Sequence, residues 1–254
     1  MQEKVSASMI SFPVQIAQRR EAHILKLNPP DKPRLIENEA FFMVMARACG
    51  LEVARTRIVR DRENNPGLLV TRFDRSWMKE EKRLVRLHQE DACQFLNRYP
   101  ADKYRISCRE IAEGLSVCAA PIAERARFIR LIAFSYLIAN GDLHAKNVSV
   151  AALGPGRSLK LSPAYDLLSS LPYGDRRMAL KVEGRDDNLA GRYFLPFGER
   201  VGVKAAAVRK ILEDLHARSE PWLERVPEIG LDERRTADLM RVMRKRREEL
   251  VEFE

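Results

Sequence analysis

A chain of 254 residues, 45% of them hydrophobic, is long and apolar enough to bury a real core, either as one large domain or as two lobes. Charged residues make up 32% of the chain and are mixed in sign, which argues against disorder. The net charge of +9 suits a phosphate-rich ligand, but the basic residues are spread from Arg19 to Arg247 and alternate with acidic ones. Direct nucleic-acid binding is therefore not favoured.

The four cysteines, Cys49, Cys93, Cys108 and Cys118, lie far apart and form no C-x-x-C pair. Zinc-type spacing and a disulfide framework are both absent, so buried free thiols are expected. No apolar run reaches the ~18 residues of a membrane span. The start, MQEKVSASMISFPVQ, lacks the apolar stretch and the small-residue cleavage site of a signal peptide. We expect a cytoplasmic protein.

Residues 1–73 predict a small lobe of mixed strands and helix. A helix is expected from about Ile36 to Cys49, because apolar residues recur there at four-residue spacing and Gly50 stands where a helix-ending glycine belongs. Strands are expected at residues 5–12, 22–27, 51–59 and 68–75. Prolines interrupt the chain before the helix, and the turn signal ENNPG separates the last two strands.

From Asp91 onward the pattern is mostly helical, which predicts a larger lobe over residues 74–254. Its most hydrophobic segment, residues 122–138, is apolar nearly all round, as expected of a helix buried at the centre of a lobe. After it, VSV and LKLSPAYD predict two short strands joined by the turn GPG. Helical periodicity returns after about Lys204, and the basic run MRKRREE is expected to be a solvated helix face.

The stretch between these two patterns carries residues suited to phosphoryl transfer. That reaction needs a carboxylate to orient the attacking hydroxyl and accept its proton, and oxygen ligands for magnesium. Asp142 and Asn147, five residues apart after the buried helix, fit the base and the first metal ligand. Asp166 follows the predicted hairpin, which would bring its carboxylate beside Asn147. One amide and one carboxylate suffice for magnesium, and Lys146 could supply positive charge at the transferred phosphate.

D-L-H-A-K-N followed by L-S-P-A-Y-D-L-L-S-S resembles the catalytic and metal-binding stretches of the HipA-type toxin kinases. Further pieces occur in the order of that family, from QEK near the start through H-I-L-K-L, I-E-N-E, RFDR and L-H-Q-E-D-A-C-Q to M-A-L-K-V-E-G. The resemblance implies an α/β (α+β), two-lobed protein-kinase-like fold with a small mixed N-lobe and a larger, mainly helical C-lobe. It also implies transfer of the ATP γ-phosphate, with Mg²⁺, to a serine or threonine of a protein.

By the same resemblance, Lys26 would hold the α- and β-phosphates and Glu39 would be its ion-pair partner, with Glu37 as the less favoured candidate. Asp142 and Lys146 would be catalytic, and Asn147 and Asp166 would bind the metal. The other residues implied around ATP are Gln2, Glu3, Lys4, the hinge residues Thr71, Arg72 and Phe73, and His144, Ala145 and Tyr165. Arg72 and Asp74 could equally form an ordinary surface ion pair. Gln89, Glu90 and Asp91 match a family signature to which no chemistry is assigned.

One departure from the family pattern concerns the N-terminus. Members of the family carry a further N-terminal subdomain and a glycine-rich phosphate loop that ends in QEK, whereas this sequence opens at Met1-Gln2-Glu3-Lys4. The loop's glycines and the usual autophosphorylated serine would precede Met1. We therefore expect residues 1–254 alone to bind ATP poorly and transfer phosphate slowly. Apolar surface around Val5, Ile10 and Phe12 would be covered by an upstream extension or a separate N-subdomain polypeptide.

The resemblance also suggests partners. These are a protein substrate, with an aminoacyl-tRNA synthetase as the first guess, and a small DNA-binding antitoxin through which the kinase would meet DNA only indirectly. No membrane partner is expected.

Two other functions stay open from the sequence. N-G-D-L-H-A-K-N also resembles the H-G-D-x-H-x-x-N loop of aminoglycoside and choline kinases, which phosphorylate small molecules; Asn140 stands where those enzymes place His, and Y-D where they usually have I-D. Alternatively, a catalytically impaired chain could act as a partner within an antitoxin–DNA complex. Nucleotide binding without phosphate transfer would favour that second alternative.

Overall fold

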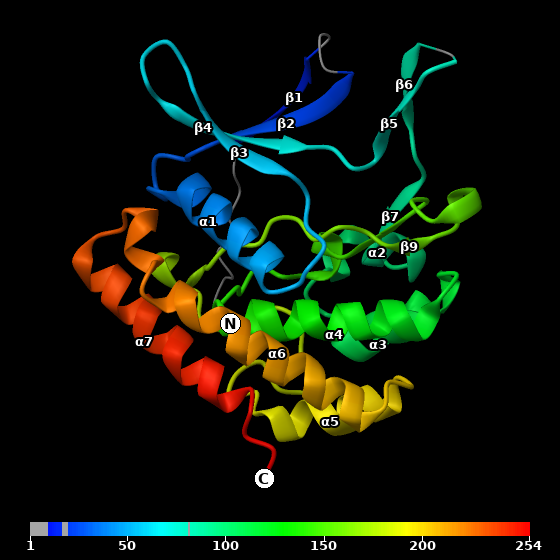
Figure 1. The fold of residues 1–254 in the computed structure, drawn as a ribbon, viewed down its shortest axis with the longest axis vertical. Coiled ribbons are helices and arrows are strands. Elements are labelled where there is room, and N and C mark those ends of the chain that lie inside the picture. Colours follow the sequence, from blue (N-terminus) through cyan, green and yellow to red (C-terminus); the bar gives the residue numbers. More distant parts are fainter. Residues whose placement is uncertain (1–9, 17–19, 81) are drawn as a thin grey trace.

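The computed structural model describes residues 10–16, 20–80 and 82–254 of the chain. Gln2, Glu3, Lys4 and Val5, for which the sequence predicted roles, lie outside these ranges, and the side chains of Ile10 and Phe12 are also not described. Figure 1 shows a sheet above a larger body of helices. This is the two-lobed mixed fold predicted from the sequence.

The upper sheet has four antiparallel strands in the order β1-β2-β4-β3. Their bounds are β1 Ile10–Ile16, β2 Glu21–Leu27, β3 Thr56–Arg60 and β4 Pro66–Thr71. Side chains alternate between the two faces of a sheet, so Ile24 and Lys26 share a face with Leu68 and Val70, their partners on β4. Helix α1 (Leu35–Ala48) lies beneath the sheet and contacts β3 and β4 (Figure 1).

Helix α1 confirms the helix predicted from Ile36 to Cys49 to within one residue at each end. The helix starts directly after Arg34, which has a φ of 64°, and is followed by Gly50, which has a φ of 81°. A left-handed residue just after a helix is the position that glycine favours. The helix carries the buried carboxylate of Glu39, and its first turns lie close to β2 and the lower lobe.

Strands β5 (Arg75–Met78) and β6 (Arg83–Arg86) form a separate antiparallel hairpin that the sequence did not predict. The expected strand over residues 68–75 was too long, because β4 ends at Thr71. The Asp74 carboxylate accepts two hydrogen bonds from Arg72, at 2.9 and 2.7 Å, and another from Arg75. These local bonds stabilise a compact connection where the apolar pattern suggested a continuing strand.

The lower lobe is built around α4 (Pro121–Leu137), which is almost entirely buried from Phe128 onward and confirms the buried helix predicted at residues 122–138. The predicted strand pair is present as β8 and β9. Helix α5 was not predicted, because Pro196 interrupts its helical pattern. The other elements of this lobe are β7 Gln89–Asp91, α2 Ala92–Phe95, α3 Cys108–Gly114, β8 Ser149–Ala151, β9 Lys160–Leu161, α5 Gly191–Arg200, α6 Ala205–Leu223 and α7 Glu233–Glu249.

One apolar core runs through both lobes, from Leu68 in β4 through Phe42 in α1 to Phe128 in α4. All four cysteines are buried in this core and are free, as predicted. Burial raises the pKa of Cys49 to about 12 and that of Cys118 to about 11, so both are protonated thiols at neutral pH. Within the described ranges, no helix is long and apolar enough to cross a membrane.

The basic run of α7 is only partly a solvated face, and the prediction was wrong for Arg246 and Arg247, which are buried. Arg246 is 2% exposed, and its guanidinium donates hydrogen bonds to the carbonyl oxygens of Tyr136 and Arg176, both at 2.8 Å, and to Asp187 at 2.7 Å. It also stacks 4.3 Å above the centre of the Tyr136 ring. Arg246 therefore anchors α7 to the end of α4.

Replacing Arg246 with methionine should lower the free energy of unfolding by roughly 3 kcal/mol, because two carbonyl groups and the partly exposed Asp187 carboxylate lose their donor. Arg244→Met is the matched control on the same helix, since the Arg244 side chain is 52% exposed, and should cost no more than about 0.5 kcal/mol. Urea denaturation measures both values. Equal stabilities for the two variants would contradict the anchoring role of Arg246.

Candidate active site

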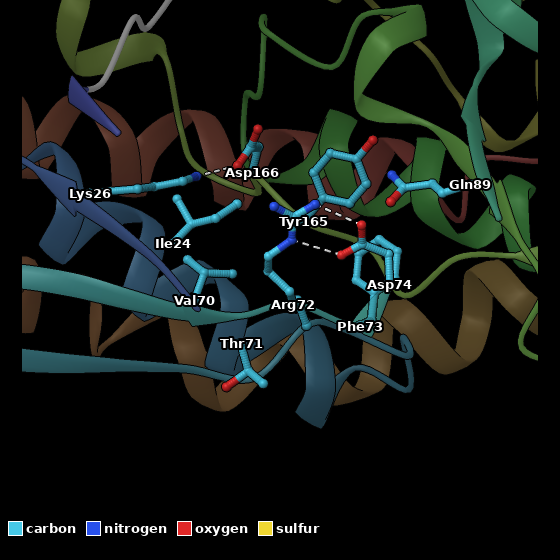
Figure 2. Close-up of a pocket in the computed structure, with 11 residues that line it drawn as sticks. Ile24, Lys26, Val70, Thr71, Arg72, Phe73, Asp74, Gln89, Tyr165 and Asp166 are labelled. Atoms are coloured by element: carbon cyan, nitrogen blue, oxygen red, sulfur yellow. Dashed lines mark hydrogen bonds and ion pairs between the residues drawn. The ribbon is translucent and has the colours of Figure 1, made fainter. Parts of the chain in front are cut away.

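A cavity of about 250 Å³ opens between the sheet and the lower lobe. Its lining comes from both lobes: Ile24, Lys26, Ala54 and Val70 with the connection from Thr71 to Asp74, and Gln89, Tyr165 and Asp166. Figure 2 shows Lys26 directed at Asp166, beside apolar Ile24 and Val70. The cavity therefore has apolar walls and a charged pair on one side.

The connection after β4 uses most of its backbone donors within the upper lobe. The Thr71 N–H donates to the Arg55 carbonyl oxygen at 2.8 Å, and the Arg72 N–H donates to that of Ala22 at 2.9 Å. Among the three predicted hinge residues, all of them described, only the Phe73 N–H has no backbone acceptor. If this segment binds a nucleotide base through a backbone donor, the geometry favours the Phe73 N–H as that donor.

Lys26 sits between two carboxylates. Its Nζ atom lies 2.8 and 2.9 Å from the two oxygens of Glu39 and also contacts Asp166 Oδ1. Glu39 is fully buried, whereas the Asp166 side chain is 35% exposed toward the cavity. Glu37, the less favoured candidate, instead accepts hydrogen bonds from Asn28 and Arg34 at 3.0 Å each. The structure thus puts Glu39 rather than Glu37 beside Lys26.

One ammonium shared by two carboxylates affects all three charges. Burial lowers the pKa of Lys26, but the charges of Asp166 and Glu39 outweigh burial and the net shift is upward. Burial raises the pKa of Glu39; Lys26 opposes this shift and the charge of Asp166 adds to it. Lys26 is therefore firmly protonated, and it is the group that limits the upward shift of the Glu39 pKa.

Asp166 reaches this cluster through an unusual backbone conformation, with a φ of 55°. The preceding residue, Tyr165, is held by two contacts of its hydroxyl group. The hydroxyl donates to the Lys146 carbonyl oxygen at 2.9 Å and lies 2.6 Å from Ser149 Oγ. The Tyr165 ring lines the cavity and lies against Phe73, with centroids 5.8 Å apart. Tyr165 therefore ties Asp166 to the loop that carries Lys146.

Residues 140–147 form a tight loop after α4. Gly141 is required there by space, since a Cβ atom would lie 2.5 Å from Asp175 Oδ2 and 2.7 Å from the Arg177 carbonyl oxygen. The Asp142 N–H donates to Asn140 Oδ1 at 3.1 Å, and the Asn147 side-chain amide donates to the Asp142 carbonyl oxygen at 2.9 Å. The loop thus brings Asp142 and Asn147 together and holds both side chains largely buried.

Lys146 and His144 of this loop have partners that the sequence did not predict. Lys146 Nζ lies 2.5 Å from Asp91 Oδ2, while the other oxygen of Asp91 accepts a hydrogen bond from the Gln94 N–H and so caps α2. Lys103 Nζ lies 3.1 Å from His144 Nε2. Burial, reinforced by the Lys103 charge, lowers the pKa of His144 to about 4, so this ring is neutral at pH 7.

The predicted site residues therefore fall into two connected groups. Lys26, Asp166, Tyr165 and the hinge line the cavity, whereas Asp142, His144, Ala145, Lys146 and Asn147 lie on the adjoining loop and are not part of the described lining. Tyr165 joins the groups by its hydrogen bond to the loop. Asp91 belongs to a signature noticed in the sequence, and its contact with Lys146 gives that signature a structural role.

A two-lobed fold with a lysine–glutamate pair above a D-x-x-x-x-N loop defines a protein-kinase-like protein. The sequence-family model of the HipA-like C-terminal domain matches residues 1–223, and the chain belongs to this family. Y4mE of Sinorhizobium fredii, provisionally named a kinase, is 31% identical over 245 residues, which cover 91% of this chain and 57% of that protein. The serine/threonine-protein kinase toxin HipA of Shewanella oneidensis is 30% identical over 170 residues, covering 60% and 39%.

Solved structures share the fold. Shewanella oneidensis HipA, in a complex with HipB and operator DNA, matches with a TM-score of 0.71 and 24% identity over 91% of this chain and 57% of that one. CtkA, a proinflammatory kinase of Helicobacter pylori, matches with a TM-score of 0.65 and 12% identity over 99% and 91%. The chain spans about half the length of the curated relatives named here.

Lys26→Met should make the stability of the protein fall more steeply as the pH rises. Without the ammonium, the buried Glu39 carboxyl has a folded-state pKa above its unfolded value of ~4.3. The stability that depends on the neutral carboxyl is therefore fully present below pH ~4.3 and is lost as the pH rises through the folded-state pKa. We expect the variant to be less stable at about pH 8 than at about pH 5. At the higher pH its free energy of unfolding should lie below that of the parent by up to ~3–5 kcal/mol.

Urea denaturation at the two pH values measures this effect. The double variant Lys26→Met/Glu39→Gln is the control, because it lacks the buried Glu39 carboxyl and should lose the added pH dependence. A single variant with the same pH profile as the parent would show that Lys26 does not lower the pKa of Glu39.

Proposed function

We propose that the chain is the ATP-dependent catalytic core of a HipA-type serine/threonine kinase, which transfers the γ-phosphate to a serine of a protein. The observation that carries the proposal is Lys26, whose buried ammonium meets Glu39 from α1 and Asp166 from the lower lobe on the wall of the cavity. A cation held in this way has the charge and position to engage phosphates, while Asp166 stays partly exposed to bind a metal.

The residues fit magnesium and ATP by their donor chemistry. Magnesium takes oxygen ligands, often one or two from the protein with the rest from water and phosphates. Asp166 offers a partly exposed carboxylate, and the hydrogen bond from Asn147 uses its amide N–H, so the amide oxygen is not consumed by that bond. When bound, the metal would supply positive charge at the phosphates. Ile24, Val70 and Phe73 give the apolar walls that a purine requires.

In this proposal Asp142 orients the acceptor hydroxyl and takes its proton. Its carboxylate is largely buried and held by the loop that also contains Asn147. Lys146, restrained by Asp91, adds positive charge near the transferred group. His144 is neutral, so it adds no charge beside the Asp142 carboxylate. Positioning and fixed charges of this kind carry most of the catalysis in phosphoryl transfer.

The division into a nucleotide-binding lobe at residues 1–73 and a catalytic lobe at 74–254 belongs to the same proposal, as do the partners. A relative was solved together with HipB and operator DNA, which supports a small DNA-binding antitoxin as a partner of this chain. DNA would then be reached only through that antitoxin. The protein substrate is proposed on the family resemblance, with an aminoacyl-tRNA synthetase as the first candidate to test.

Two substitutions should separate binding from transfer. Asp142→Asn should leave the affinity for Mg²⁺-ATP nearly intact and lower phosphate transfer by ~10²–10⁴-fold, because the general base is lost. Asp166→Ala should weaken the magnesium-dependent part of ATP binding itself. Calorimetric titration gives the affinities, and release or transfer of the radiolabelled γ-phosphate gives the rates.

Asp61→Asn provides a control, since Asp61 lies in an exposed turn away from the cavity. It should change neither affinity nor rate. Equal phosphate transfer by Asp142→Asn and the parent protein would remove Asp142 from the mechanism, and magnesium-dependent ATP binding unaffected by Asp166→Ala would refute the proposed metal site.

A further inference from the structure

A segment between α2 and α3 packs against the 140–147 loop, although no motif marks it in the sequence. It includes a single 3-10 turn at Pro100–Asp102, followed by Lys103 and Tyr104. The Lys103 carbonyl oxygen accepts a hydrogen bond from the Ala145 N–H at 3.1 Å. The backbone of this segment is therefore tied directly to the loop that carries Asp142.

Tyr104 contacts both Asp142 and His144. Its hydroxyl donates to Asp142 Oδ1 over 3.3 Å. Its ring meets the His144 ring edge-on, with centroids 5.2 Å apart and planes at 71°. A carboxylate rotates easily about its last bond, and a hydrogen bond to one oxygen together with a packed neighbour restricts that rotation.

Lys103 acts on the neighbouring ring. Its ammonium lies 3.1 Å from His144 Nε2 and 4.8 Å from the centre of the Tyr104 ring. An ammonium has only donors, so Nε2 must accept and the ring proton must lie on Nδ1. Because Nε2 is also the atom that faces Asp142 Oδ1, at 4.0 Å, this tautomer prevents the ring from donating to that oxygen and leaves it to Tyr104.

We propose that Tyr104 and Lys103 are positioning residues for Asp142. Tyr104 sets the rotation of the Asp142 carboxylate, and Lys103 fixes His144 in the Nδ1–H tautomer. The inference rests on the function proposed above, in which Asp142 orients the acceptor. Neither residue belongs to the described lining of the cavity, so both should influence phosphate transfer without altering nucleotide affinity.

The role of Tyr104 is tested by Tyr104→Phe, which removes only the hydroxyl. With Mg²⁺-ATP as substrate and water as the acceptor, kcat should fall by about 10- to 100-fold while KM for ATP is unchanged, because the base is misplaced and the nucleotide site is not. Tyr99→Phe is the matched control, from an 81% exposed tyrosine of the same region, and should leave both parameters unchanged. An unchanged kcat in Tyr104→Phe, or a change confined to KM, would overturn this role.

The role of Lys103 is tested without any need for turnover. Long-range ¹H–¹⁵N NMR of the histidine rings reports which nitrogen carries the proton. The His144 ring should be in the Nδ1–H form in the parent and should shift toward the Nε2–H form in Lys103→Met. Lys210→Met, from an exposed position of α6, should leave the spectrum of His144 unchanged. An Nε2–H ring in the parent, or an unaltered ring in Lys103→Met, would contradict the inference.

The Asp142→Asn variant distinguishes a failure of the proposed kinase function from a failure of the positioning role of Tyr104. If it hydrolyses ATP as fast as the parent, the proposed function fails, whatever the state of His144. If Asp142→Asn is slow and Tyr104→Phe is as fast as the parent, only the positioning role of Tyr104 fails.

Discussion

The ammonium of Lys26 joins segments that are far apart in the chain. It lies on β2 of the upper sheet, Glu39 comes from α1, and Asp166 follows β9 of the lower lobe. Removing an ammonium and a carboxylate from water is costly, and the pair is stable only if further polar contacts compensate for the lost hydration. Here the second carboxylate supplies that compensation, and it comes from the other lobe. The Lys26 cluster therefore joins the two lobes at the cavity, beside the apolar core and the backbone contacts that they also share, and it sets the charge on this side of the cavity.

The three groups of this cluster differ in exposure, and the difference has chemical consequences. Glu39 is fully buried and cannot exchange partners with solvent, whereas Asp166 is partly open to the cavity. A cation that binds in the cavity would compete with Lys26 for Asp166, and anionic phosphates would in turn attract the released ammonium. Glu39 would keep Lys26 in place during that exchange. Lys26 thus has one permanent partner, Glu39, and one that can exchange, Asp166. This arrangement suits a site that binds a metal together with phosphates.

Local patterns in the sequence were sufficient for much of the fold. The helices α1 and α4 follow directly from apolar spacing, and the glycine after α1 marks its end. The choice between Glu37 and Glu39 stayed open, because residues two apart on a helix point in widely different directions and only the position of β2 decides which one faces Lys26. Features that depend on distant partners were not predictable. The burial of Arg246 requires carbonyl groups of α4 and of the segment before α5, and nothing in its local sequence indicates them.

The same limit applies to the site. Asp142, Asn147 and Asp166 were predicted because their spacing has a chemical meaning, whereas Lys103 and Tyr104 act through contacts with residues about 40 positions away. We propose that a metal–nucleotide complex binds between Asp166 and the 140–147 loop. Paramagnetic broadening of backbone NMR signals by Mn²⁺-ATP tests it directly, and it detects weak binding as well as tight binding. Signals of Asn147, Asp166 and their neighbours should broaden first, and Asp166→Ala should abolish the effect. Broadening centred elsewhere on the protein, or unaffected by Asp166→Ala, would contradict it.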